Sequence, residues 1–137
     1  MNSIIKEFKQ KTDFYSEKGA SEDTISAAEK ALKIQFAPEY KEYLREFGSV
    51  SCGGHELTGI SADENLDVVG VTKHNLEKNP NIKMPLYVIE ETHVDGIVIW
   101  QSHTGEVFQS EYKGTPVKIF QSLADYVATF TNRPGEG

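Results

Sequence analysis

Cys52 and His55 are the residues whose types and spacing come closest to a chemical site. A C-x-x-H pair supplies half of a structural zinc site, but no second pair lies at a suitable distance in the sequence. A thiol also needs a nearby base or positive charge to act as a nucleophile, and the acidic surroundings of Cys52 are expected to raise its pKa instead. We therefore interpret Cys52 as a loop thiol and His55 as an exposed imidazole.

The other histidines offer only weak metal pairs. His93 with Asp95, or His103 with Glu106, would place two ligand types on neighbouring turns, but turns are commonly polar without binding anything. The sequence therefore predicts no metal ion, no cofactor and no catalytic residue.

Two further patterns also have structural explanations. Glu90 and Glu91 are adjacent, so on a strand they would face opposite sides and would not form a carboxylate pair. The glycine-rich run 48–54 follows an expected helix and contains no lysine, unlike a phosphate-binding loop. It is expected to stop the helix and reverse the chain.

The distribution of charge is more informative than these motifs. The chain has 137 residues with 14 basic and 21 acidic side chains, and its net charge is −7. Residues 48–112 hold three of the basic and ten of the acidic residues, so the excess lies in the middle of the chain. This pattern fits either a well-solvated surface or a negative face for a basic partner, and it disfavours direct contact with nucleic acid.

The amino-acid composition limits the classes of protein to which the chain can belong. Hydrophobic residues make up 38% and charged residues 26%, which predicts one soluble domain over residues 1–131 and a flexible tail over 132–137. No stretch approaches the roughly 20 apolar residues of a membrane span, and the single cysteine is typical of a reducing cytoplasm. We expect a cytoplasmic protein without a membrane partner.

Helical periodicity dominates the first half of the chain. Apolar spacing predicts a helix over 2–15, and Ser21 is placed to cap a second helix that runs to Lys33. Pro38 suits the first turn of a third helix, which Gly48 is expected to end in a left-handed conformation.

The period changes in the second half. A further helix is expected over 68–78, with Val71 and Leu76 inward, and a final helix after Ser122. Short apolar runs separated by turn residues predict strands at 56–60, 86–89, 97–100, 107–108 and 117–120. The sum is an α+β fold: N-terminal helices, a central antiparallel meander and a C-terminal helix.

Several of these residues together resemble a known family. The N-terminal half contains Gly19-Ala20-Ser21-Glu22, Ile25, Glu29, Leu32, Pro38, Tyr40, Tyr43, Leu44 and Phe47-Gly48, and the C-terminal part contains Phe120, Ser122, Leu123 and Tyr126. This order resembles the SUKH superfamily of Smi/Knr-type domains, although Ala37 stands where an aliphatic residue such as Leu is more usual. The resemblance implies an α+β domain and, for bacterial members, immunity to a polymorphic toxin, often a nuclease. Fungal relatives instead resemble regulators of cell-wall assembly.

This resemblance gives the charge pattern a candidate partner. We expect binding to a cognate toxin, a basic nuclease domain, through an acidic face, with a regulatory protein-binding scaffold as the alternative. Trp100 is expected mainly in the core, with a partner contact as the minor interpretation. The candidate contact residues are Glu56, Asp63, Glu64, Asp67, Glu90, Glu91, Asp95 and Glu106, with Tyr87 and Trp100 as aromatic anchors.

Overall fold

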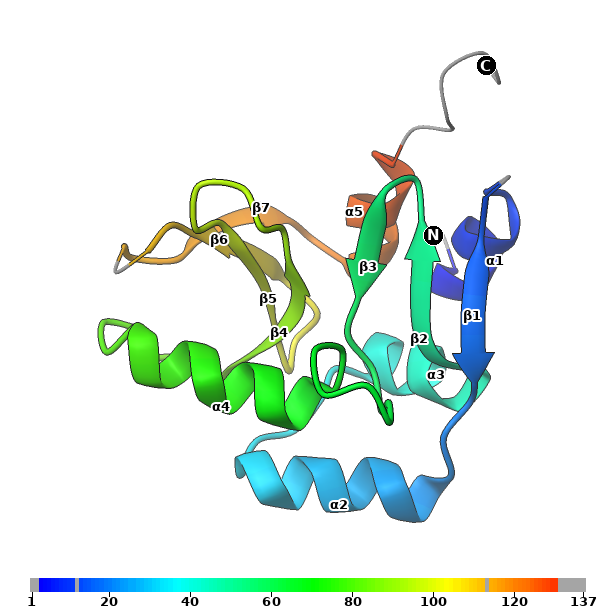
Figure 1. The fold of residues 1–137 in the computed structure, drawn as a ribbon, viewed down its shortest axis with the longest axis horizontal. Helices are drawn as coiled ribbons and strands as arrows, with labels where there is room; N and C mark the ends of the chain where they lie inside the picture. The colour runs from blue at the N-terminus through cyan, green and yellow to red at the C-terminus, as the bar shows by residue number, and fades with distance from the viewer. Residues whose placement is uncertain (1–2, 12, 113, 131–137) are drawn as a thin grey trace.

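The computed structural model describes residues 3–11, 13–112 and 114–130, so the tail predicted over 132–137 lies outside the described residues. Its centre is a seven-stranded antiparallel sheet in which the strands stand in chain order (Figure 1). The helices precede, interrupt and follow this meander, which confirms the predicted α+β class. The elements are α1 (Ile4–Lys9), β1 (Tyr15–Lys18), α2 (Glu22–Leu32), α3 (Pro38–Glu46), β2 (Phe47–Cys52), β3 (His55–Leu57), α4 (Val68–Lys78), β4 (Leu86–Glu91), β5 (Val98–Ser102), β6 (Val107–Ser110), β7 (Val117–Phe120) and α5 (Leu123–Ala128).

The prediction of one helix over 2–15 is wrong, because α1 ends at Lys9 and the chain then forms the edge strand β1. Phe14 leaves the helical path to pack its ring on those of Phe8 and Phe47, with ring centroids 5.8 and 5.1 Å apart. The Asp13 carboxylate accepts the Gly53 N–H at 2.8 Å, which fixes the start of β1 beside the β2–β3 turn. Tertiary contacts therefore override the helical period here.

The next two helices begin as predicted. Ser21 Oγ accepts the Thr24 N–H at the start of α2, and Pro38 occupies the first turn of α3. The predicted end at Gly48 is wrong, because Phe47 is already extended and Gly48 lies within β2. Glycine is required there for close packing: a Cβ would lie 2.5 Å from the Lys18 carbonyl oxygen of β1.

Strand pairing in the sheet is least extensive between β3 and β4. These strands share a single register pair, Leu57 with Glu90, and Figure 1 shows β1–β3 splayed from β4–β7. The core forms two clusters that do not follow this division of the sheet. The large cluster joins α1, α2, α3 and α5 to strands β2–β6, and the smaller one packs α4 on β4, β5 and β6. The prediction that Val71 and Leu76 of α4 face inward is confirmed, since Val71 belongs to the smaller cluster and the partly buried Leu76 packs against it.

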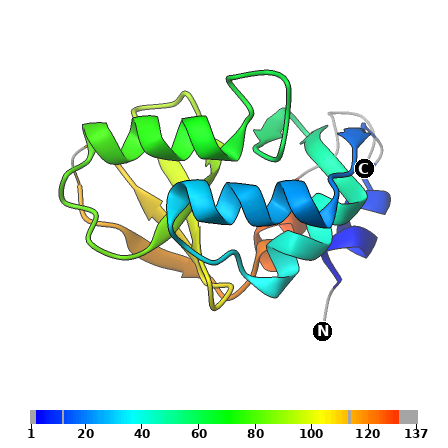
Figure 2. The same cartoon turned by 90° about the horizontal axis from the view of Figure 1, so that it is seen from below.

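The helices lie in two groups. Figures 1 and 2 show α2 and α4 running side by side below the sheet. In contrast, α1 packs against α3 and α5, so the first and last helices meet. Lys11 strengthens this junction by donating from Nζ to the Phe130 carbonyl at 3.1 Å.

The tyrosines of the α3 motif attach that helix to the middle of the sheet. Tyr43 donates its O–H to the Thr58 carbonyl at 2.6 Å, and Tyr40 shares a 3.0 Å hydrogen bond with the Thr58 hydroxyl. Burial raises the pKa of both phenols, so they stay neutral donors. These motif residues therefore maintain the fold rather than form a surface site.

Candidate functional site

Five of the eight acidic candidates line two adjoining hollows between β3, α4 and β4. The first hollow has a volume of about 350 Å³ and includes Glu56, Asp63, Glu91 and His93. The second has a volume of about 510 Å³, and Glu91 and Asn65 line both. We call the group Glu56, Asp63, Glu64, Asp67 and Glu91 the acidic surface.

Short-range hydrogen bonds hold the loop that carries most of this surface. Asp63 accepts the Asn65 N–H at 2.9 Å, and the Asp63 N–H donates to Ser61 Oγ at 3.0 Å. Asp67 accepts the Ser61 N–H at 3.2 Å. Both aspartates thus shape the loop before α4. Their side chains are presented on a fixed backbone.

Glu91 reaches the same surface from a different element. It ends β4, and one of its carboxylate oxygens accepts Asn75 Nδ2 of α4 at 2.8 Å. Among the described residues, no lysine or arginine forms an ion pair with any member of the acidic surface. No lysine or arginine side chain of the described ranges therefore neutralises the negative charge of the acidic surface by direct pairing. This charge favours the long-range attraction of a positive partner.

The remaining acidic candidates lie elsewhere. Glu90 faces the opposite side of β4, as predicted for neighbours on a strand, and its side chain is only 5% exposed. It accepts hydrogen bonds from Tyr126 and lies 3.0 Å from His55 Nδ1. Glu106 is paired with Lys118 at 2.9 Å, and that hydrogen bond lowers its pKa. Asp95 is exposed in the β4–β5 turn.

The structure removes both aromatic anchors from the contact surface. Trp100 is fully buried in the smaller core, where its Nε1–H donates to Ser110 Oγ at 2.8 Å. Tyr87 is also fully buried, accepting the Ala37 N–H at 3.0 Å and donating to Gln101 Oε1 at 2.7 Å. Both rings stabilise the fold, and neither reaches a partner in this arrangement.

Cys52 lies on a strand and is buried, which corrects the interpretation as a loop thiol. Burial raises its pKa to about 11, with Asp13 adding to the rise, as expected from its acidic surroundings. His55 is its register partner across the β2–β3 hairpin, but the imidazole stacks on Phe130 at 3.6 Å and points Nδ1 at Glu90. Within residues 3–11, 13–112 and 114–130, no group of three His, Cys, Asp or Glu side chains is placed to hold a metal ion.

Glu39 is a structural residue that sequence reasoning missed. Its carboxylate accepts the N–H groups of Leu123 and Ala124 at 2.7 and 2.9 Å, and Gln101 Nε2 donates to it at 3.0 Å. It thereby joins the first turn of α3 to the start of α5. The sequence signal was only an acidic residue in a first helical turn, which predicts a dipole effect and not a contact across the chain.

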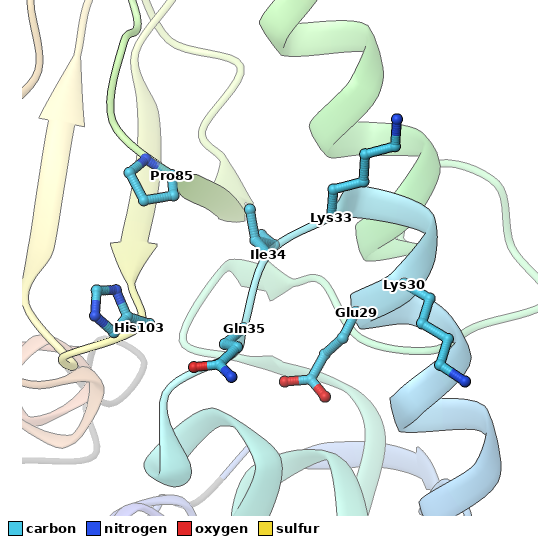
Figure 3. A pocket seen from close by; sticks show the side chains of 7 residues that line it. All are labelled: Glu29, Lys30, Lys33, Ile34, Gln35, Pro85 and His103. Atoms are coloured by element: carbon cyan, nitrogen blue, oxygen red, sulfur yellow. The ribbon is translucent and has the colours of Figure 1, made fainter.

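Figure 3 shows a shallow pocket that carries basic residues, between the end of α2 and the turn after β5. Lys30 and Lys33 line it, but their amines point away from the other lining residues. Glu29 is already used, because it accepts the Phe36 N–H at 2.8 Å. This pocket therefore lacks converging donors for an anion.

The fold and the site define an α+β domain that offers a charged surface. No helix in the described part of the chain is both long and apolar enough to cross a membrane. A family model described as SUKH_5, SMI1-KNR4 cell-wall, matches residues 1–130, and the chain belongs to this family. This membership confirms the resemblance found in the sequence and supports a protein-binding scaffold of the Smi/Knr type. A search of curated proteins finds no match to the chain.

Proposed function

We propose that this protein is a cytoplasmic immunity protein that binds and neutralises a cognate toxin, a basic nuclease domain, one to one. The observation that carries the proposal is the acidic surface, where side chains from a loop and two strands converge without a lysine or arginine partner among the described residues. Family membership supports a protein-binding role, and immunity is a common role of SUKH domains.

Electrostatics gives the mechanism. Nucleases bind phosphates through positive surfaces, so an acidic protein can occupy or shield such a surface. Long-range attraction also raises the rate of encounter, which suits the capture of a lethal protein at low concentration. Neutralisation by occupancy requires no chemical step, and Cys52, with its pKa raised to about 11, is not activated for one.

The test is co-expression with the C-terminal toxin domain encoded beside the gene, scored by survival and by co-purification. Rescue with a stable one-to-one complex is the expected result. Toxicity without a complex would contradict the proposal and would favour the second candidate, a regulatory scaffold of the Smi/Knr type. That candidate is supported by the cell-wall description of the matching family.

Association kinetics then test the surface. Glu56→Gln, Asp63→Asn and Glu91→Gln together should slow association about 10- to 100-fold at low salt and much less at high salt. The matched control is Glu22→Gln, Glu42→Gln and Glu46→Gln, which removes the same charge from exposed helical positions. Equal slowing by the two triple variants would show that only net charge matters.

A further inference from the structure

Exposed large apolar side chains gather at one end of the sheet. In the part of the chain that the structure describes, five such residues are exposed, and Val94, Tyr112 and Val117 are three of them. Their exposed fractions are 57, 61 and 62%. Val94 lies in the β4–β5 turn, Tyr112 in the loop after β6, and Val117 begins β7. We call these three residues the apolar rim.

The two loops of the apolar rim are neighbours in space. Val98, which follows the turn, pairs with Ser110, which precedes Tyr112. A Cβ added at Gly96 would lie 3.1 Å from Tyr112 Cβ, so the turn backbone packs directly on the base of the tyrosine. Both loops lie in the left half of Figure 1, at the end of β6 and β7 farther from α5.

The β4–β5 turn is built to hold Val94 outward. His93 and Asp95 both adopt positive φ, at 60° and 52°, a conformation that costs a non-glycine residue energy. Thr92 Oγ1 offsets this cost by donating to the Ile97 carbonyl at 2.8 Å and accepting the Val94 N–H at 3.2 Å. Val94 is thus fixed at an exposed position by two strained neighbours and a hydrogen-bonded frame.

The Val94 end of the apolar rim borders the acidic surface. His93, which directly precedes Val94, lines the same hollow as Glu56, Asp63 and Glu91. Exposed carboxylates follow Val94 and precede Tyr112 in the chain. An apolar group bordered by charge is the usual composition of a protein-binding surface.

We propose that the apolar rim is the anchor of the partner interface, filling an apolar patch beside the basic surface of the toxin. This inference rests on the proposed function. Charges mainly set the rate of encounter, whereas a few desolvated apolar and aromatic side chains set the lifetime of a complex. A second copy of the chain fits the rim poorly, because a two-fold contact there would bring two acidic surfaces together.

The experiment measures the kinetics of the full chain binding to the toxin domain encoded beside its gene. The double variant Val94→Ser/Tyr112→Ser should raise the dissociation rate about 10-fold or more and change the association rate by less than about 3-fold. Its control is Tyr15→Ser/Met84→Ser, which removes two exposed apolar side chains from other parts of the surface. Unchanged thermal melts show that each variant is folded.

The outcomes separate the two proposals. If the wild type does not bind the toxin domain, both the proposed function and the proposed role of the apolar rim as an anchor are overturned. If the wild type binds and the acidic triple variant slows association, but Val94→Ser/Tyr112→Ser dissociates like the wild type, only the anchor is overturned. Equal weakening by Tyr15→Ser/Met84→Ser would also overturn it. Sedimentation showing a wild-type dimer that the rim variant converts to a monomer would assign the rim to self-association instead.

Discussion

The Glu39 carboxylate is one of the contacts that hold the last helix to the body of the protein, and its removal gives a quantitative test of the fold. Glu39→Ala removes an acceptor of three hydrogen bonds and leaves the N–H groups of Leu123 and Ala124 without it. Hydrogen bonds to a charged group contribute about 1.5–3 kcal/mol each to the free energy of unfolding. A buried donor left without a partner lowers that free energy by about as much.

Water reduces this loss, because Glu39 lines a cavity of about 830 Å³ from which water can reach the freed donors. We therefore expect the free energy of unfolding to fall by about 2–4 kcal/mol, well short of the sum of three full losses. Glu39→Gln keeps one acceptor oxygen without the charge and should lie between the alanine variant and the wild type.

The assay is urea unfolding followed by the fluorescence of Trp100, which is fully buried in the native state. The control is Glu42→Ala, an exposed residue of the same helix that lines the same cavity, and its effect should stay within about 0.5 kcal/mol. If Glu39→Ala and Glu42→Ala were equally stable, the connection from α3 to α5 would have no energetic role and the reasoning would be refuted.

Three further predictions concern Cys52, Gly59 and Gly70, of which the first two are buried and the third is exposed. Because burial raises the pKa of Cys52 to about 11, alkylation of the native thiol at pH 8 should be at least about 100-fold slower than in urea, and comparable rates would contradict the burial. Gly59→Ala would place a Cβ 1.6 Å from the Gly48 carbonyl oxygen, so it should lower the melting temperature sharply or prevent folding. Gly70→Ala in α4 meets no atom within 4 Å and should instead stabilise by about 0.5–1 kcal/mol, a contrast that thermal melts would check.

The elements that could be predicted from the sequence are those with local causes. Ser21 and Pro38 begin their helices through side-chain and ring geometry that needs no distant residue. The turn at Asp95-Gly96 likewise forms where the dipeptide permits positive φ. By contrast, β1 depends on Phe14 reaching Phe47 and on Asp13 reaching Gly53, contacts that a helical pattern does not encode.

The candidate site was predictable as a region and not as a set of side chains. The acidic excess of residues 48–112 covers the part of the chain in which the acidic surface forms, and the binding of a partner there stays a prediction. Which carboxylates share a face depends on strand register, and the irregularity between Val88 and Glu90 in β4 is invisible in composition. Tyr87 was misassigned as an anchor for a related reason: aromatic residues serve both cores and interfaces, and only packing distinguishes the two. Trp100 lies in the core, as its main interpretation expected.

The chain order of the strands has a consequence for how the protein is made. Each strand pairs with the one synthesised just before it, so the sheet can grow while the chain is still emerging. The β2–β3, β4–β5, β5–β6 and β6–β7 pairings close short loops, whereas β1–β2 and β3–β4 close longer segments that contain helices. Two contacts of the C-terminal segment behave differently, because they join residues far apart in sequence. Lys11 and Phe130 are 119 residues apart, and Glu39 and Leu123 are 84 residues apart. Synthesis thus separates two stages, an early sheet assembled from neighbours and a late closure by α5. The packing of α1 is complete only after α5, the last helix to be synthesised, has folded against it.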